Sequence, residues 1–398
     1  MHALVCEKVA QAVGILDELG IDAWLTFVRE TTESADPVLP IILGQNLTWQ
    51  SALLVTRRGE RIAIVGNLDG DLVRGCGAWT QVIPYVQGIK QPLCETLARL
   101  DPQQLAVNFS TDDVKADGLT LGMWRLLTGY LDGTPLAQRL ISAEKLIAAL
   151  RGRKSPTEVE RIRAAVAETE TLFAETGRFL RVGRSEREVA DFLKEQARQR
   201  GLELAWDPTG CPIVNSGPAS SVGHSVPSED IRLAPGHVVH IDFGVKKDGF
   251  CSDIQRCWYL LQAGETQPPP AVQAAFDASV AAIRAAAAVL RPGVAGWEVD
   301  AAARAKLTSL GFPEYQHAVG HQLGRAAHDG GGLLGPRWER YGDTPFRPVE
   351  AGNVFTLELG VYDLPPHGPV GLEEDVLVET NGVSWLSQPQ TQMWLAPG

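Results

Sequence analysis

Five residues in the second half of the chain have side chains that could bind a pair of divalent metal ions: Asp242, Asp253, His321, Glu358 and Glu374. Four carboxylates and one imidazole form an oxygen-rich ligand set, which suits manganese best and accepts zinc, cobalt or iron(II) as substitutes. The four negative charges would balance two divalent cations. Such a metal pair generates a hydroxide nucleophile at neutral pH and stabilises a developing oxyanion, so we expect metal-assisted hydrolysis.

Two segments that carry these acids resemble each other. Residues 236–245 read Gly-His-Val-Val-His-Ile-Asp-Phe-Gly-Val, and residues 352–361 read Gly-Asn-Val-Phe-Thr-Leu-Glu-Leu-Gly-Val. Each pattern predicts a buried strand after a glycine turn, and each places one carboxylate, Asp242 or Glu358, among apolar residues. An ionised carboxylate in a core strand is costly unless a positive charge meets it. The match therefore predicts a duplicated fold whose halves bring their acids together.

The helices around these segments follow the same repeat. A capping box at Ser155 and Glu158 predicts a helix that ends near Leu180, and a second capping box at Ser185 and Glu188 predicts the next helix. The same order of elements at long period supports an internal repeat. We expect the second helix pair over residues 270–290 and 297–310.

Residues 1–150 predict a separate α/β domain, and residues 151–398 a catalytic domain. An amphipathic helix over residues 6–19 opens the first domain, and an Arg58-Gly59 turn predicts a hairpin. We expect its strands over residues 23–28, 51–56, 61–65, 82–86 and 105–109.

The bulk composition excludes several partners. The chain has 398 residues, which favours two domains, and a net charge of −12, which argues against binding to nucleic acid. No apolar run of membrane-spanning length and no signal peptide is expected. The six cysteines are scattered and form no C-x-x-C pair, so we expect free thiols, no membrane partner and a cytoplasmic protein.

The motifs around these residues resemble the creatinase, aminopeptidase P and prolidase superfamily, from about residue 155 to the end of the chain. The resemblance rests on four motifs: Ile-Asp242-Phe-Gly with Asp253, His317-x-x-Gly-His321-x-x-Gly-x-x-x-His328, Thr-x-Glu358-x-Gly, and Glu374-Asp375. It implies an α+β fold, in which an α/β N-terminal domain precedes a pita-bread catalytic domain with an internal pseudo-twofold repeat.

The resemblance also implies roles for single residues. Asp253 and Glu374 would bridge both metals, Asp242 would bind one of them, and His321 and Glu358 the other. Glu358 would also shuttle a proton from the bridging water.

Three further histidines match positions that bind substrate in the family. His224 and His328 would contact the scissile peptide and stabilise the tetrahedral intermediate, and His317 would line the pocket for proline. From the residues alone, His224 could instead be an exposed loop histidine, although function is favoured, and His317 could equally be a structural one.

Two positions depart from the family pattern. Leu359 replaces a common proline, and Leu372 stands where many relatives have an arginine two residues before the last glutamate. Neither change removes a ligand. One of Arg337, Arg340 and Arg347 could instead bind a substrate carboxylate.

The resemblance implies a two-metal peptidase that cleaves the bond before proline in Xaa-Pro dipeptides by attack of a metal-bridging hydroxide. One alternative is an Xaa-Pro aminopeptidase that acts on longer peptides. Less favoured alternatives are a metal-free creatinase-like hydrolase and a non-catalytic binding module. The family resemblance also implies a homodimer.

Overall fold

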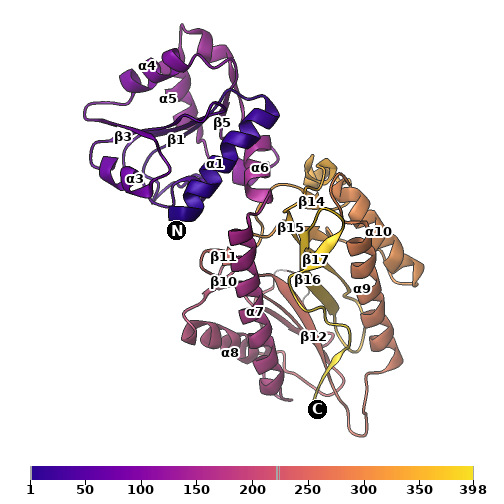
Figure 1. Ribbon diagram of the computed structural model, residues 1–398. Helices are drawn as coiled ribbons and strands as arrows, with labels where there is room; N and C mark the ends of the chain where they lie inside the picture. The colour runs from indigo at the N-terminus through magenta and orange to yellow at the C-terminus, as the bar shows by residue number, and fades with distance from the viewer. Residues whose placement is uncertain (1, 221–222, 224, 398) are drawn as a thin grey trace. The chain divides into compact units, whose positions relative to one another are not determined.

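The structure is a computed structural model, and it describes residues 2–220, 223 and 225–397. The chain divides into two compact units, Met1–Arg151 and Gly152–Gly398 (Figure 1). Each unit has its own sheets and its own apolar clusters. They are therefore described separately.

The N-terminal unit is built on one six-stranded sheet with the order β4-β3-β2-β1-β5-β6. Its strands are β1 (Ala23–Val28), β2 (Ser51–Thr56), β3 (Arg61–Gly66), β4 (Gln81–Tyr85), β5 (Leu105–Val107) and β6 (Leu140–Ser142). Its helices are α1 (His2–Leu19), α2 (Leu39–Ile42), α3 (Gly70–Cys76), α4 (Lys90–Leu100), α5 (Leu121–Leu131) and α6 (Glu144–Gly152), with short 3-10 turns at Val114–Ala116 and Pro135–Gln138.

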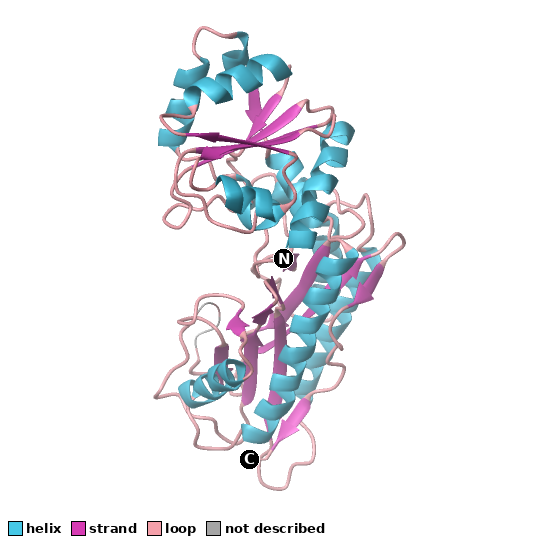
Figure 2. Cartoon of the chain, turned by 60° about the vertical axis from the view of Figure 1, so that its left-hand side comes forward, coloured by secondary structure: helices cyan, strands magenta, loops and turns pink. Residues whose placement is uncertain are grey.

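Both faces of this sheet are covered by helices (Figure 2). Along β1, Trp24 and Val28 belong to the apolar cluster that includes residues of α1, α3 and α6. Leu25 and Phe27 point to the other face and join the cluster of α4 and α5. A strand buried on both faces reads as a continuous apolar run, which explains why the sequence predicts this strand. The expected hairpin is also present, as β2 pairs antiparallel with β3.

The second unit is built on a seven-stranded sheet, in which β15-β16-β12-β9-β8 form one path, β17 pairs with β16 and β18 pairs with β12. The strands of this sheet are β8 (Ile213–Ser216), β9 (Val238–Phe243), β12 (Ile254–Leu260), β15 (Val354–Val361), β16 (Val370–Val378), β17 (Val383–Trp385) and β18 (Trp394–Ala396). A small three-stranded sheet contains β7 (Glu203–Leu204), β10 (Val245–Lys247) and β11 (Phe250–Cys251). A two-stranded sheet contains β13 (Gly320–His321) and β14 (Leu333–Leu334).

The expected internal repeat is confirmed in this unit. One half combines the pair α7 (Pro156–Phe179) and α8 (Glu186–Gln199) with the β9–β12 ladder; the other combines α9 (Pro270–Val289) and α10 (Gly296–Ser309) with the β15–β16 ladder. The two halves meet where β12 runs antiparallel to β16, so the pseudo-twofold axis passes between these strands. Two 3-10 turns, at Glu339–Tyr341 and Thr344–Phe346, lie between β14 and β15.

Strand alternation gives the large sheet two different faces. On β15 and β16, Leu357, Leu359, Leu372 and Val376 pack in the apolar cluster that contains α9. Because successive side chains of a strand point to opposite faces, the alternate residues face away from α9. We call the side that faces away from α9 the inner face.

Helix α9 corrects one expectation from the sequence. Its 20 residues are long and apolar enough to cross a membrane by length and composition, which the sequence analysis did not anticipate. Eight of its residues are buried, however, and several of them join the cluster against β15 and β16. The helix is therefore accounted for as a core helix of this unit.

The repeat predicts how two helix starts should respond to substitution. Ser185 accepts a hydrogen bond from the N–H of Glu188 at 3.1 Å, and the Glu188 carboxylate accepts the N–H of Ser185 at 2.7 Å. At the matching start of α10, Glu298 accepts the N–H of Ala295 at 2.9 Å, but alanine has no side-chain oxygen for the reciprocal bond. We expect Ala295→Ser to stabilise the unit by about 0.5–1 kcal/mol and Ser185→Ala to destabilise it by about 1 kcal/mol.

Urea unfolding of the two variants and the wild type measures both changes. Equal shifts in the same direction would contradict this account of the caps.

Candidate metal centre

A row of polar residues crosses the inner face of the large sheet. Asp242 on β9 pairs with Gln255 on β12, Gln255 pairs with Glu373 on β16, and Glu373 pairs with Glu358 on β15. Directly paired residues have their side chains on the same face of a sheet. The register therefore brings three carboxylates and one amide from four strands into one line across the pseudo-twofold axis.

Asp253 reaches the same place from the turn that leads into β12. Gly244 follows the β9 acid by two residues, and a Cβ atom there would lie 1.9 Å from the carbonyl oxygen of Ser252. Only glycine allows this close approach of the returning chain. As a result, the carboxyl groups of Asp242 and Asp253 are close enough for each to shift the pKa of the other.

His321 lies over this row because β13 crosses close to β15. A Cβ atom at Gly320 would lie 2.0 Å from the carbonyl oxygen of Thr356, so this position also requires glycine. The His321 Nε2 atom lies 3.7 Å from Asp253, 3.8 Å from Glu358 and 3.8 Å from Glu373. Asp253, His321 and Glu373 offer ligand atoms that all lie within 4.8 Å of one another.

The acids repel one another in a buried setting. Burial raises the pKa of Asp242 to about 7, and burial with the nearby charge of Asp242 raises the pKa of Glu358 to about 8. Burial and neighbouring carboxylates also raise the pKa of Asp253 and of Glu373 well above the usual range. Burial lowers the pKa of His321 to about 3, so this imidazole is neutral and brings no positive charge.

The donor set fits divalent cations. Among the described residues, no lysine or arginine forms an ion pair with Asp242, Asp253, Glu358 or Glu373. The Asp242 Oδ1 atom is buried without a hydrogen-bond partner. Buried charges are normally paired or bound to metal, and carboxylates with one neutral imidazole suit a hard or borderline cation.

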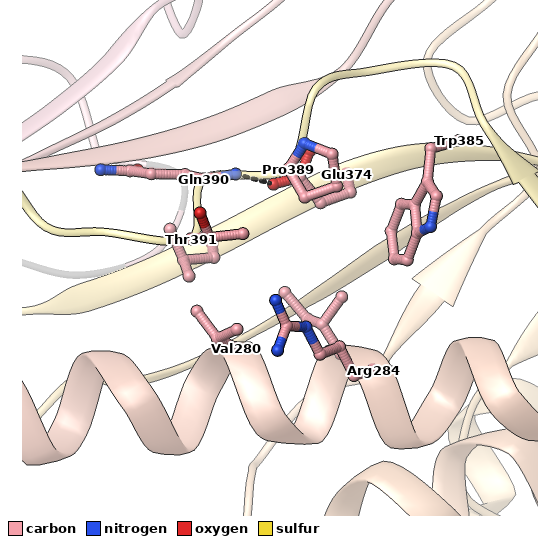
Figure 3. A pocket seen from close by; sticks show the side chains of 9 residues that line it. Val280, Arg284, Glu374, Trp385, Pro389, Gln390 and Thr391 are labelled. Atoms are coloured by element: carbon pink, nitrogen blue, oxygen red, sulfur yellow. Dashed lines mark hydrogen bonds between the residues drawn. The ribbon is translucent and has the colours of Figure 1, made fainter.

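Glu374 does not lie in this cluster, which corrects the expectation from the sequence. It follows Glu373 on β16 and therefore points to the opposite face, where Figure 3 shows it beside Gln390 on the side of α9. Both Glu374 oxygens accept hydrogen bonds from Arg256, at 3.0 and 2.9 Å, and the two side chains are almost fully buried. Ser387 and the Gln390 N–H also donate to Glu374.

The replacement of Glu374 by Glu373 as the cluster residue also changes which position lacks the arginine that is common in the family. Since Glu373 is the cluster residue, the residue two positions before it is Gly371. Leu372 instead packs on α9.

The predicted histidines differ in where they lie. The His328 ring lies 4.2 Å from the His321 ring, centre to centre and edge on, and it is exposed. His317 is also exposed and contacts the Tyr315 ring at 5.5 Å. His224 lies outside the described residues.

The three loop arginines are occupied by protein contacts. The Arg337 guanidinium lies over the Trp297 ring at 4.5 Å. Arg340 donates to the carbonyl of Gln316, and Arg347 donates to the carbonyl of Gly331. These contacts do not single out one of the three as a carboxylate anchor.

Three polar residues in or beside the centre were missed by the sequence analysis. Glu373 and Gln255 complete the cross-strand row, and Asp375 accepts the backbone N–H of Asp253 at 3.2 Å. Strand alternation contained a signal for Glu373. Leu372, Glu374, Val376 and Val378 share one face, and three of these four are core residues, so the odd-numbered positions had to face the other way.

The sequence matches the model of metallopeptidase family M24 over residues 160–380. An uncharacterized peptidase of Staphylococcus aureus (strain MW2) is 31% identical over 339 residues, which is 84% of this chain and 87% of the relative. A second uncharacterized peptidase, from Bacillus subtilis (strain 168), is 30% identical over 67% of this chain and 69% of its own length.

Solved structures share the fold. An Xaa-Pro dipeptidase from Bacillus anthracis has a TM-score of 0.76 at 23% identity and covers 98% of this chain and 99% of its own. An X-Pro aminopeptidase from Thermotoga maritima MSB8 has a TM-score of 0.72 at 24% identity, with 97% and 99% covered. These likenesses support the pita-bread fold with its N-terminal domain. Because the family match spans more than half of the sequence and includes the row of acids, the chain belongs to metallopeptidase family M24.

Proposed function

We propose that this metallopeptidase hydrolyses the peptide bond before proline in Xaa-Pro dipeptides with the help of two divalent cations. The observation that carries the metal site is the cluster of four carboxylates, two buried and two half-buried, and one neutral imidazole, with which no described lysine or arginine forms an ion pair. Two solved structures of the same fold are described as an Xaa-Pro dipeptidase and an X-Pro aminopeptidase, which supports specificity for proline.

The proposed ligands are Asp242, Asp253, His321, Glu358 and, in place of Glu374, Glu373. The charge of four carboxylates balances two divalent cations, and the oxygen-rich set favours Mn²⁺, with Zn²⁺, Co²⁺ or Fe²⁺ as substitutes. When bound, such cations supply a water nucleophile at neutral pH and polarise the scissile carbonyl. The resemblance assigns the two bridging positions to Asp253 and, by the corrected register, to Glu373.

The protein's own residues would hold the substrate and move the proton. The Glu358 side chain is 21% exposed, more than those of Asp253 (7%) and Glu373 (2%), so it is more accessible to a substrate than these two acids. We propose that it transfers a proton to the leaving imino nitrogen. His328, exposed beside His321, would hydrogen-bond the carbonyl oxygen, and His317 would line the proline pocket; a similar role is proposed for His224.

The nearest alternative is an Xaa-Pro aminopeptidase that acts on longer peptides. The fold does not separate the two activities, because solved structures described by both names superpose on this chain with similar TM-scores, 0.76 and 0.72. We also propose a homodimer in the cytoplasm, by family resemblance and from the scattered free cysteines.

Removal of metal tests the mechanism directly. Dialysis against a chelator is expected to abolish hydrolysis of Ala-Pro, because the acids then lack the cations that activate water, and addition of Mn²⁺ is expected to restore it. Circular dichroism before and after dialysis controls for unfolding. Activity that survives complete chelation in a folded protein would exclude the metal mechanism and favour a creatinase-like hydrolase.

A pair of glutamine substitutions tests the corrected register. Glu373→Gln removes a carboxylate from the cluster, so Mn²⁺ affinity should fall by more than the roughly 10–100-fold that loss of an outer-shell partner costs. Glu374→Gln removes the charge that pairs with buried Arg256, so it should destabilise the fold by about 3 kcal/mol and leave Mn²⁺ affinity nearly unchanged.

Isothermal titration calorimetry and urea unfolding measure the two effects. The opposite pattern, with affinity lost in the Glu374 variant, would restore the original assignment. The metal-free Glu373 variant should be at least as stable as the metal-free wild type, because one repelling carboxylate is gone.

Substrate length distinguishes the two candidate activities. We expect a higher kcat/KM for Ala-Pro than for Ala-Pro-Ala, because a dipeptidase site closes beyond proline and binds the terminal carboxylate. Ala-Ala serves as the control for proline specificity. A clear preference for the tripeptide would replace the dipeptidase by the aminopeptidase, with the metal site unaffected.

A further inference from the structure

Gln255 lies at the middle of the acidic row and is its only neutral member. In the register it pairs with Asp242 on one side and with Glu373 on the other, and Glu358 follows on β15. The pseudo-twofold axis passes between β12 and β16, so Gln255 occupies in one half the position that Glu373 occupies in the other. Its side chain is buried, with 4% of the residue exposed.

The Gln255 amide nitrogen holds both glutamates. Its Nε2 atom donates to Oε2 of Glu358 at 3.1 Å and to Oε2 of Glu373 at 3.0 Å. The other oxygen of each glutamate, Oε1, lies 3.8 Å from His321 Nε2. One oxygen of each carboxylate is therefore held by the amide, and its partner faces the imidazole.

His240 sets the orientation of this amide from the side opposite the two glutamates. Ionised carboxylates only accept hydrogen bonds, so the N–H₂ end of Gln255 must face them and its carbonyl oxygen must face away. That oxygen lies 2.9 Å from His240 Nε2, which supplies the donor. The other ring nitrogen of His240 contacts the side-chain amide of Asn215 at 3.1 Å.

Gly371 leaves the space that this pair needs. A Cβ atom at Gly371 would lie 2.8 Å from His240 Nε2 and 2.9 Å from Gln255 Oε1. Any larger residue at this position would displace the hydrogen bond between the histidine and the glutamine. The three residues therefore form one fitted group on the inner face.

We propose that Gln255 is a positioning residue of the metal centre, which presents Oε1 of Glu358 and Oε1 of Glu373 to the cations and is itself oriented by His240. The inference rests on the proposed metal site. Outer-shell groups that hydrogen-bond a ligand fix its orientation, and their loss typically costs 10–100-fold in metal affinity.

The variant Gln255→Met tests this role, because methionine keeps the length of the side chain and removes both the donor and the acceptor. Metal-free protein is titrated with Mn²⁺ by calorimetry, and the visible absorption spectrum of the Co²⁺-loaded protein is recorded. We expect Mn²⁺ affinity to fall by about 10–100-fold and the Co²⁺ bands to shift, because the coordinating oxygens are no longer held.

Gln390→Met provides a matched control. Gln390 is as buried as Gln255, with 3% exposed, and its side chain also makes three hydrogen bonds, with the N–H and the carbonyl of Cys257 and with the carbonyl of Gln392. It lies on the opposite side of the sheet, next to Glu374. This substitution should cost stability in the same way and leave Mn²⁺ affinity and the Co²⁺ spectrum as in the wild type.

His240→Leu gives a second, independent test that leaves Gln255 in place. Since His240 acts through Gln255, its loss should weaken Mn²⁺ binding in the same direction but less, and the double variant should bind no more weakly than Gln255→Met alone. If Gln255→Met does not fold, the Mn²⁺ affinity of His240→Leu decides whether the inference holds.

The outcomes separate this inference from the proposed function. A wild-type protein that binds no divalent cation would overturn the metal site and the inference together. The role of Gln255 alone would be overturned if the wild type binds Mn²⁺ and the folded Gln255→Met and His240→Leu variants have Mn²⁺ affinities within about threefold of the wild type. Such a change is smaller than the loss of an outer-shell group causes.

Discussion

The mutual repulsion of four closely placed carboxylates is the constraint on which the second unit depends. Asp253 and Glu373 offer ligand atoms within 4.8 Å of each other, and two unit charges at that separation repel by about 3–4 kcal/mol at an effective dielectric constant of 20. No described lysine or arginine pairs with the cluster. A fold that keeps such a group together needs a rigid support and a cation that the chain itself does not supply.

The duplicated sheet is that support. Asp242 and Glu358 lie at corresponding positions of β9 and β15, and the ladders that connect them through β12 and β16 set their distance by backbone hydrogen bonds. The same alternation separates two kinds of charge. Glu373 faces the cluster, whereas its neighbour Glu374 is neutralised by Arg256 on the other side. Adjacent glutamates thus lie in opposite settings, Glu373 in the acidic cluster and Glu374 in a buried ion pair.

The fold was largely predictable from local signals, and the site only in part. Capping boxes, glycine turns and apolar runs depend on neighbouring residues, and both predicted caps, at Ser155 and Ser185, are present. Asp242, Asp253, His321 and Glu358 lie together as the motifs suggest. Glu374 failed because a motif alignment can slip by one residue, and on a strand a slip of one residue reverses the face.

Gln255 shows what local patterns do not contain. Its role depends on the single pairing that joins β12 to β16. No turn or spacing in the sequence predicts a contact between Gln255 and Glu373, which are 118 positions apart in the chain. The row has four strand positions but only three acids. A carboxylate at Gln255 would add a fifth charge to the cluster, one more than two divalent cations neutralise. An amide at this place instead donates to two acids at once, so the half of the repeat that lacks the glutamate stabilises the half that has it.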